Sequence, residues 1–167
     1  MSQAVFVFAA YANTGKTSYL CGLIAALKAE GLRVAVVKDG HDHAPMLDRP
    51  GTDSDRLRKA GADAVALCSD ELSALMWPGR QPLGDMLARL DADIILLEGF
   101  KQEKYPQIGL YRAASRQPLP APPESYIALI TDTPFEAALP QFPLDNPAPL
   151  AQFLMELAGL AEKRTTT

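Results

Sequence analysis

A continuous apolar run that passes into a small polar loop and then into a helical pattern constrains the fold of this chain most. The run is AVFVFAA at residues 4–10, the loop ends in Gly15, Lys16 and Thr17, and apolar residues then recur at helical spacing. Such a run is typical of a strand buried on both faces. A second run, RVAVVK, completes a strand–helix–strand unit, whose right-handed crossover favours a parallel sheet.

The same alternation continues along the chain. Further strands are predicted at 63–69, 72–77, 91–100, 108–112 and 126–131, and further helices at 53–61, 83–90 and 148–163. The proline-rich segment 113–125 is expected to be an exposed loop. The pattern predicts an α/β fold of the phosphate-loop NTPase type: a three-layer, mostly parallel sheet with helices on both faces. One nucleotide-binding domain is expected over residues 1–163, with a frayed tail at 164–167.

Composition disfavours several classes of protein. The 167 residues carry a net charge of −4, which is unfavourable for a broad nucleic-acid or membrane-surface footprint. No apolar run approaches the ~20 residues of a membrane helix, and we expect no signal peptide. Cys21 and Cys68 lie in apolar contexts without metal-ligand spacing, so we expect buried free thiols. These features favour a cytoplasmic protein that binds neither nucleic acid nor membrane.

The loop between the first strand and the first helix is typical of a phosphate site. Its backbone N–H groups, together with the N-terminus of the helix and its dipole, converge on an anion. Lys16 would contact the β- and γ-phosphate oxygens, which also makes it a catalytic candidate, and the Thr17 hydroxyl would ligate Mg²⁺. The alternative is an ordinary strand–turn–helix junction with a solvated lysine. The residues assigned to nucleotide binding here are Asn13, Thr14, Gly15, Lys16, Thr17 and Ser18.

Two positions of the loop lack the glycine that often stands there. Ala10 ends a strand, where a small residue keeps negative φ at little cost. Asn13 is the residue type that, besides glycine, most readily adopts left-handed φ. We therefore expect positive φ at Asn13 and an intact loop.

Acidic residues are sorted by the edge of the sheet on which they fall, since open parallel sheets bind ligands at the carboxyl ends of their strands. Asp93 and Glu98 stand at opposite ends of one predicted strand, roughly 16 Å apart at about 3.3 Å per residue. Glu98 shares the edge of the loop and is the candidate for Mg²⁺ and for polarising the attacking water, unless it is only a surface carboxylate. Gly99 would let backbone approach a phosphate. Asp132 is a candidate reader of guanine or an ordinary turn aspartate.

The polar loop after residue 38 leaves two interpretations open. The loop carries His41, Asp42, His43 and Asp48. The run His-Asp-His suggests a transition-metal site, but consecutive loop residues without cysteine form a weak zinc pattern. The alternative is a switch-like loop that orders around nucleotide and Mg²⁺. Asp53 could also cap the helix that follows it.

Several stretches together resemble the molybdopterin-guanine dinucleotide biosynthesis protein B family. They are AAYANTGKTS, VVKDGHDHAPMLDRPGTDSDRLRKAGA, IILLEGFK and ITDTP, followed by LDNPAPLAQFL. The resemblance implies a GTP-binding accessory protein of molybdenum cofactor synthesis, related to dimeric phosphate-loop GTPases, that hydrolyses GTP slowly and assists the guanylyltransferase. A second loop lysine used across such dimers would stand at Tyr11 and is absent. The matched residues beyond the loop are Lys38, Asp48, Gly51, Asp53, Ser54, Arg58, Gly61, Glu98, Gly99, Phe100 and Lys101.

Two other functions remain open from the residues alone. A small-molecule kinase or ATP-dependent ligase would use the same phosphate site, and Arg49, Arg56 and Arg58 are grouped, although no arginine-rich lid is evident. A metal-delivery chaperone would use His41 and His43. For a homodimer, the short apolar strand IGLYR is predicted to be an exposed edge that pairs with another copy.

Overall fold

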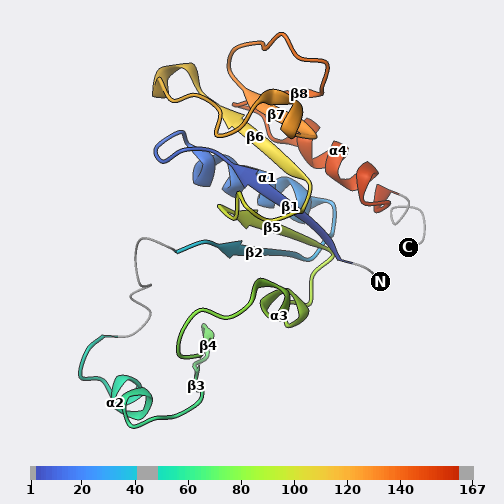
Figure 1. Ribbon diagram of the computed structural model, residues 1–167. Helices are drawn as coiled ribbons and strands as arrows, with labels where there is room; N and C mark the ends of the chain where they lie inside the picture. Colours follow the sequence, from blue (N-terminus) through green and yellow to red (C-terminus); the bar gives the residue numbers. More distant parts are fainter. Residues whose placement is uncertain (1–2, 41–48, 162–167) are drawn as a thin grey trace. The chain divides into compact units, whose positions relative to one another are not determined.

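The computed structural model describes residues 3–40 and 49–161 (Figure 1). The chain divides into two compact units, residues 1–39 with 91–167 and residues 40–90, and each is described by itself. The phosphate-type loop and the large sheet belong to the first unit. The single domain predicted over residues 1–163 stays a prediction. No helix among the described residues is long and apolar enough to cross a membrane.

The first unit is built on a six-stranded sheet in the order β2-β5-β1-β6-β7-β8 (Figure 1). Every pairing in it is parallel, which confirms the α/β class predicted from the buried apolar runs. The short strand β8 was not predicted, because three residues with a proline at the end show no strand period. The strands are β1 Ala4–Ala9, β2 Val34–Lys38, β5 Ile94–Glu98, β6 Gln107–Tyr111, β7 Ala128–Thr131 and β8 Gln141–Pro143.

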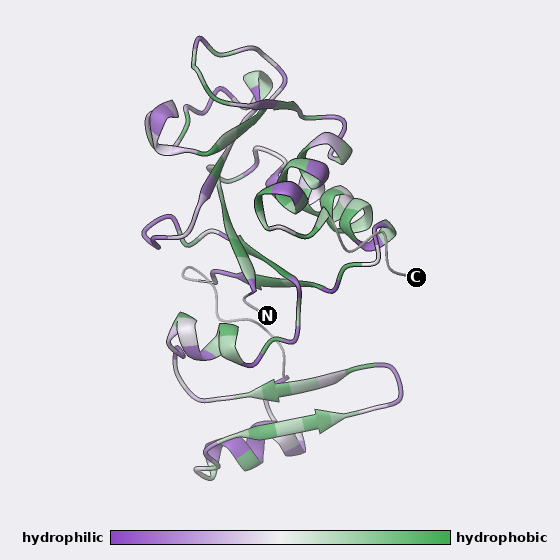
Figure 2. Ribbon diagram, turned by 90° about the vertical axis from the view of Figure 1, so that its right-hand side faces the viewer, coloured by the Kyte–Doolittle hydropathy of each residue, from purple (hydrophilic) through white to green (hydrophobic). Residues whose placement is uncertain are grey.

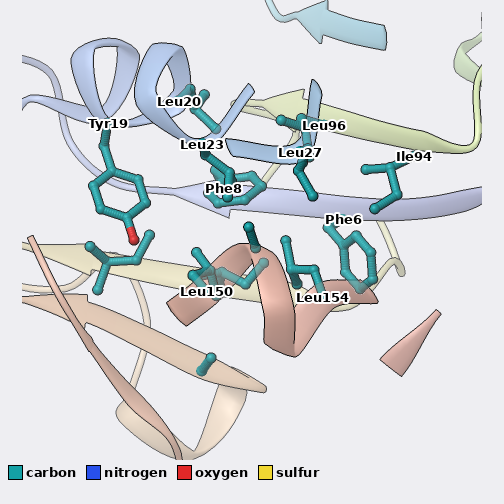
Figure 3. Packing of buried hydrophobic residues seen from close by; sticks show 14 of the residues in the cluster. Phe6, Phe8, Tyr19, Leu20, Leu23, Leu27, Ile94, Leu96, Leu150 and Leu154 are labelled. Carbon is teal, nitrogen blue, oxygen red and sulfur yellow. The ribbon is translucent and has the colours of Figure 1, made fainter. Parts of the chain in front are cut away.

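Two helices of this unit pack on the same face of the sheet. They are α1, Lys16–Ala29, and α4, Ala148–Leu157, and their leucines enclose Phe6 and Phe8 of β1 (Figure 3). On the opposite face, Leu119 and Phe135, which lie before and after β7 in the chain, pack against Ala9, Tyr126 and Leu129. Segment 113–125, predicted as a loop, contains two single-turn 3₁₀ helices, Ala113–Ser115 and Pro123–Ser125.

The prediction that residues 108–112 form an exposed edge is wrong. Strand β6 lies between β1 and β7, and both Ile108 and Leu110 are almost completely buried. Gly109, at the centre of the strand, lets the aromatic ring of Tyr126 approach closely. Within the described residues, the outer strands of this sheet are β2 and β8.

The second unit contains helix α2, Asp53–Lys59, an antiparallel hairpin of β3, Val65–Cys68, and β4, Ser73–Met76, and helix α3, Leu83–Ala88. Figure 2 shows the hairpin strands in mostly hydrophobic colours. Several large apolar side chains of the second unit are nevertheless exposed: Leu57, Leu67, Leu72 and Leu75. The predicted burial of both thiols is wrong, since Cys21 and Cys68 are exposed. An apolar neighbourhood in sequence does not place a residue on the buried side of its helix or strand.

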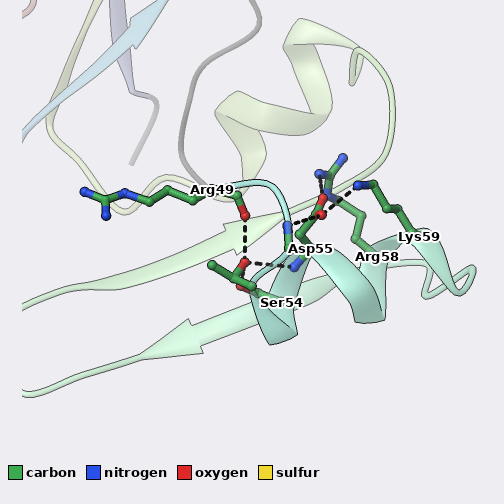
Figure 4. A network of polar contacts seen from close by, with 7 residues as sticks. Arg49, Ser54, Asp55, Arg58 and Lys59 are labelled. Carbon is green, nitrogen blue, oxygen red and sulfur yellow. Dashed lines mark hydrogen bonds and ion pairs between the residues drawn. The ribbon is translucent and has the colours of Figure 1, made fainter.

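A buried carboxylate organises the start of α2 (Figure 4). Asp55 accepts hydrogen bonds from the Gly51 N–H at 2.9 Å, Arg58 at 2.8 Å and Lys59 at 2.7 Å. The Gly51 N–H, followed by Lys59, holds the pKa of Asp55 below its ordinary value. The N-cap is Thr52, whose hydroxyl accepts from the Asp55 N–H, so the suggestion that Asp53 caps this helix is wrong.

Candidate nucleotide site at the phosphate loop

Parallel strand ends bring the predicted phosphate-loop residues and Glu98 to one edge of the sheet. The register places Glu98, at the end of β5, beside Phe8 of β1 on one side and Lys38 of β2 on the other. The loop begins directly after β1 and leads into α1. The opposite end of β5 carries Asp93, whose carboxylate accepts from the backbone and guanidinium N–H groups of Arg33. The structure therefore brings Glu98 to the loop and keeps Asp93 away from it.

The loop adopts the backbone conformation predicted for it. Asn13 has φ 61°, which confirms the left-handed conformation expected of it, and Gly15 has φ 91° as the N-cap of α1. Ala10 is buried and does not have positive φ, so alanine fits where glycine often stands. The Thr14 hydroxyl donates to the Tyr11 carbonyl at 2.9 Å and closes the turn. Among the described residues no side chain caps the N-terminus of α1, which suits its first N–H groups to binding an anion.

The hydroxyl of Thr17 and the carboxylate of Glu98 meet in front of the loop. The Thr17 hydroxyl donates to Glu98 Oε1 at 2.8 Å, and Lys38 Nζ lies 4.0 Å from the same oxygen. A hydroxyl and a carboxylate are oxygen ligands of the kind that Mg²⁺ takes, and the ion usually keeps several waters besides one or two protein groups. The pair therefore fits an Mg²⁺ ion that is also bound by phosphate oxygens.

Lys16 is half-buried among other charges. Burial lowers its pKa, Glu98 opposes that effect, and the ammonium groups of Lys101 and Lys38 add to it. The Lys101 ammonium also lies 4.7 Å from the centre of the Tyr11 ring. Three lysines thus converge on the loop around one strand-end glutamate, an arrangement that suits a polyanion. Sequence reasoning matched Lys101 to the family without giving it a role, and no spacing rule would have brought it to Tyr11.

A cavity of about 660 Å³ adjoins the loop on its other side. It is lined by residues of the loop and α1 and by the ends of the strands from β6 to β8: Thr14, Gly15, Ser18, Tyr19, Gly22, Arg112, Thr131, Asp132, Pro143, Leu144, Asp145 and Pro147. The guanidinium of Arg112 lies close to Gly15, where an added Cβ would be 3.6 Å from it. Asp132, predicted to read a base, lines this cavity, and its carboxylate accepts from the Ala113 N–H at 2.9 Å.

Tyr19 lines this cavity and carries a buried hydroxyl. The side chain is 5% exposed and extends away from α1 (Figure 3), and burial raises the pKa of its hydroxyl. Among the described residues, no partner lies within hydrogen-bonding distance of that hydroxyl. A buried hydroxyl without a partner costs free energy. Sequence reasoning missed Tyr19 because an aromatic residue in a helix usually belongs to the core.

Other candidate residues belong to the second unit or lie outside the described residues. Arg49, Arg56 and Arg58 belong to the second unit, and Arg58 is engaged with Asp55. The possible metal ligands His41, Asp42 and His43 lie outside the described residues, as does Asp48 of the same loop. Within residues 3–40 and 49–161, no group of three or more histidine, cysteine or acidic side chains forms a metal cluster.

The parallel sheet, the Gly-Lys-Thr loop between β1 and α1, and the glutamate at the end of β5 define a phosphate-loop protein of the nucleoside-triphosphate-binding type. Residues 5–132 match the family described as molybdopterin guanine dinucleotide synthesis protein B, and the chain belongs to that family. It is 40% identical over 131 residues to a molybdopterin-guanine dinucleotide biosynthesis adapter protein of Haemophilus influenzae, covering 75% of this chain and 73% of the relative.

Two further comparisons cover almost the whole chain. The adapter protein of the same description from Escherichia coli is 36% identical over 161 residues, which span 91% of each protein. The crystal structure of a MobB protein homologue from Bacillus stearothermophilus matches 93% of this chain and 97% of its own, with a TM-score of 0.63 and 30% identity. The resemblance stated from the sequence motifs is thereby confirmed.

Proposed function

We propose that this protein is a GTP-binding adapter of molybdenum cofactor synthesis, acting where molybdopterin is joined to a guanine nucleotide. The observation that supports nucleotide binding most strongly is the Thr17 hydroxyl 2.8 Å from Glu98 at the opening of α1, next to Lys16. The assignment to this pathway follows from family membership and from the adapter proteins to which the chain is similar.

The proposed nucleotide lies across the loop. Its phosphates contact the N–H groups from Asn13 to Ser18 and the ammonium of Lys16, and its base and ribose enter the cavity. Asp132 is the proposed guanine-reading residue, since a carboxylate accepts from the donors on the Watson–Crick edge of guanine, which adenine lacks at the corresponding ring position. Its existing contact with the Ala113 N–H uses Oδ1 and leaves Oδ2 for the base.

Mg²⁺ in this proposal is held by the Thr17 hydroxyl and, directly or through water, by Glu98. The ion would offset charge on the β- and γ-phosphates. Glu98 and Lys16 are the proposed catalytic residues, with Glu98 polarising the attacking water and Lys16 contacting the transferred phosphoryl group. Gly99, whose φ is 97°, follows Glu98 in a tight turn that keeps backbone close to the phosphates.

Hydrolysis by the protein alone is proposed to be slow, below ~1 s⁻¹, where enzymes typically reach about 10 s⁻¹. Slow hydrolysis is expected because no glutamine or arginine can be assigned from the sequence as the in-line partner of Glu98. The proposed partner is the guanylyltransferase, together with other cofactor-assembly proteins and a second copy of this chain. A partner that orders the site or supplies positive charge raises such rates by roughly 10³–10⁵.

Single-turnover hydrolysis of GTP with Mg²⁺ tests this function. The purified protein is measured alone and with the guanylyltransferase added, and the Glu98→Gln variant serves as control. We expect slow hydrolysis alone, acceleration by the transferase, and neither in the variant. Rapid hydrolysis by the lone protein would show that a complete catalytic set is present, which contradicts an adapter role.

A further inference from the structure

A tight turn after β5 carries Lys101 to the phosphate loop. Gly99 and Phe100 both have positive φ, 97° and 52°, which is costly for phenylalanine. The turn is held by the Glu103 N–H, which donates to the Phe100 carbonyl at 3.0 Å. It is also held by the Gln107 amide, which donates to the carbonyls of Lys101 at 3.0 Å and Glu103 at 3.2 Å. The position of the Lys101 backbone is therefore specified at a cost in backbone strain.

Close packing restricts the backbone conformation of this turn. An added Cβ at Gly99 would lie 2.8 Å from Asp39 Cβ, and the Asp39 N–H donates to the Glu98 carbonyl at 2.9 Å. Only glycine fits both this approach and the positive φ. The segment that follows Glu98 is thus tied to the end of β2 on one side and to the start of β6 on the other.

The Lys101 side chain rests on the loop itself. Its Nζ lies 4.7 Å from the centre of the Tyr11 ring, a cation–π distance, and Tyr11 is the second residue of the loop. Within residues 3–40 and 49–161, no carboxylate forms an ion pair with Lys101, while Glu98 is already shared between Thr17 and Lys38. An ammonium held next to Lys16 without a carboxylate partner is in place for an external anion.

The order of the strands identifies which end of a nucleotide this ammonium meets. The cavity for a base is lined by residues after β6 and β7, on one side of β1, whereas Lys101 follows β5 on the other side. Lys101 does not line that cavity, and it comes three residues after the proposed Mg²⁺ ligand Glu98. The terminal phosphate lies beside the metal, at the end farthest from the base.

We propose that Lys101, seated on the Tyr11 ring, binds the γ-phosphate and makes the site select nucleoside triphosphate over diphosphate. The inference rests on the proposed function, because it adds a residue to the same nucleotide site. Because Lys101 stands in the turn after β5, this contact would make that turn respond to whether a triphosphate or a diphosphate is bound. Tyr11 acts as the positioning residue, since its ring fixes where the ammonium stands.

The test compares GTP and GDP affinities, each with Mg²⁺, by isothermal titration. For Lys101→Ala we expect a loss of about tenfold or more in GTP affinity and a change within about twofold for GDP, since only the triphosphate makes the lost charge-assisted contact. Lys104→Ala is the matched control: it removes the same charge three residues on, from an exposed side chain. Lys101→Arg should recover part of the GTP affinity, and Tyr11→Leu should give an intermediate loss.

The possible outcomes distinguish a wrong γ-phosphate assignment from a wrong proposed function. Equal losses for GTP and GDP in Lys101→Ala, or equal effects of the Lys101 and Lys104 variants, would overturn the γ-phosphate assignment while leaving the proposed function intact. Unchanged GTP affinity in Lys101→Ala, with the wild type binding normally, would do the same. A wild-type protein that binds neither nucleotide would refute the proposed function and this inference with it.

Discussion

At the scale of single residues, the loop depends on a few backbone conformations that only certain side chains tolerate. Asn13 at φ 61° takes the left-handed conformation that glycine would otherwise provide, and Gly15 at φ 91° opens α1. Asparagine adopts this region at modest cost, whereas a β-branched residue is strongly strained there. The loop therefore keeps its shape without the glycine that is often found at position 13.

Substitutions at Asn13 test this explanation. We expect Asn13→Gly to retain GTP affinity, because glycine adopts the same φ without strain. Asn13→Val should weaken GTP binding by about tenfold or more, since a strain of order 1–3 kcal/mol must be overcome to form the loop. Nucleotide titration of both folded variants provides the measurement. Equal affinity in the two variants would show that φ at this position does not govern binding.

The depressed pKa of Lys16 predicts a pH dependence of binding. Burial lowers this pKa in the free protein, so between the lowered value and the ordinary one of about 10.4 the unfolded chain binds more protons than the folded chain. The Lys16 contribution to the free energy of unfolding therefore rises with pH across that interval. In the proposed site GTP contacts the protonated lysine, so we expect GTP affinity to fall as pH rises through the lowered pKa, with proton uptake on binding.

The measurement is GTP affinity between about pH 7 and pH 10, in buffers of different ionisation enthalpy. Lys16→Arg keeps its charge throughout this range and serves as the control, in which the fall should be weaker. A wild-type affinity that stays constant up to the pKa of a free lysine would contradict the role given to burial.

At the scale of elements, β6 is the strand whose place in the sheet was least visible in the sequence. Its neighbours β1 and β7 cover both edges, and Gly109 at its centre has no room for a side chain. An added Cβ would lie 2.7 Å from Leu129 Cδ2 and 3.0 Å from Tyr126 Cδ2. The Tyr126 ring cannot shift freely, because its hydroxyl accepts from the Ala121 N–H at 2.9 Å.

Gly109→Ala should therefore lower the free energy of unfolding by roughly 1–3 kcal/mol, the usual cost of overpacking. Gly84→Ala in α3 is the matched control, since nothing lies within 4 Å of its added Cβ and its φ is not positive. That change should be neutral or stabilise the protein by about 0.5–1 kcal/mol. Denaturant unfolding of both variants measures the difference. Equal stabilities would mean that the packing around β6 is looser than described.

The sequence predicts the phosphate end of the site better than the base end. Continuous apolar runs predict strands of a parallel sheet, so β1, β2 and β5 were predictable, although β2 is an outer strand and only partly buried. The parallel order also placed Glu98 at the edge of the loop. The base end depends on the order of β6, β7 and β8, which no local pattern specifies. Tyr19 and Arg112 therefore came together only in the structure. The contact of Lys101 with the loop was not predictable either, because the position of Lys101 depends on a strained turn.

At the scale of the whole molecule, a symmetric homodimer remains a prediction, but the surfaces expected to form its interface differ from the strand predicted from the sequence. Strand β6 provides no free edge, but β2 is an outer strand on which Val36 is 42% exposed. In the second unit, Leu72 is 73% and Leu75 50% exposed. Exposed strand edges and clustered apolar side chains are surfaces that association covers. Sedimentation should give about twice the mass of the 18.0 kDa chain. A monomer mass at every concentration, with and without nucleotide, would contradict the dimer.

We expect this chain to hold GTP with Mg²⁺ at the loop between β1 and α1. The most direct test is isothermal titration of the wild-type protein with GTP and with ATP, each with Mg²⁺ and with a chelator, alongside Lys16→Ala of unchanged melting temperature. We predict saturable GTP binding that is tighter than ATP binding and weakened by the chelator. The lysine substitution should reduce it by at least about tenfold, since a charge-assisted contact is worth roughly 1.5–3 kcal/mol. Undiminished GTP affinity in the folded Lys16→Ala protein, or ATP bound as tightly as GTP, would contradict this account.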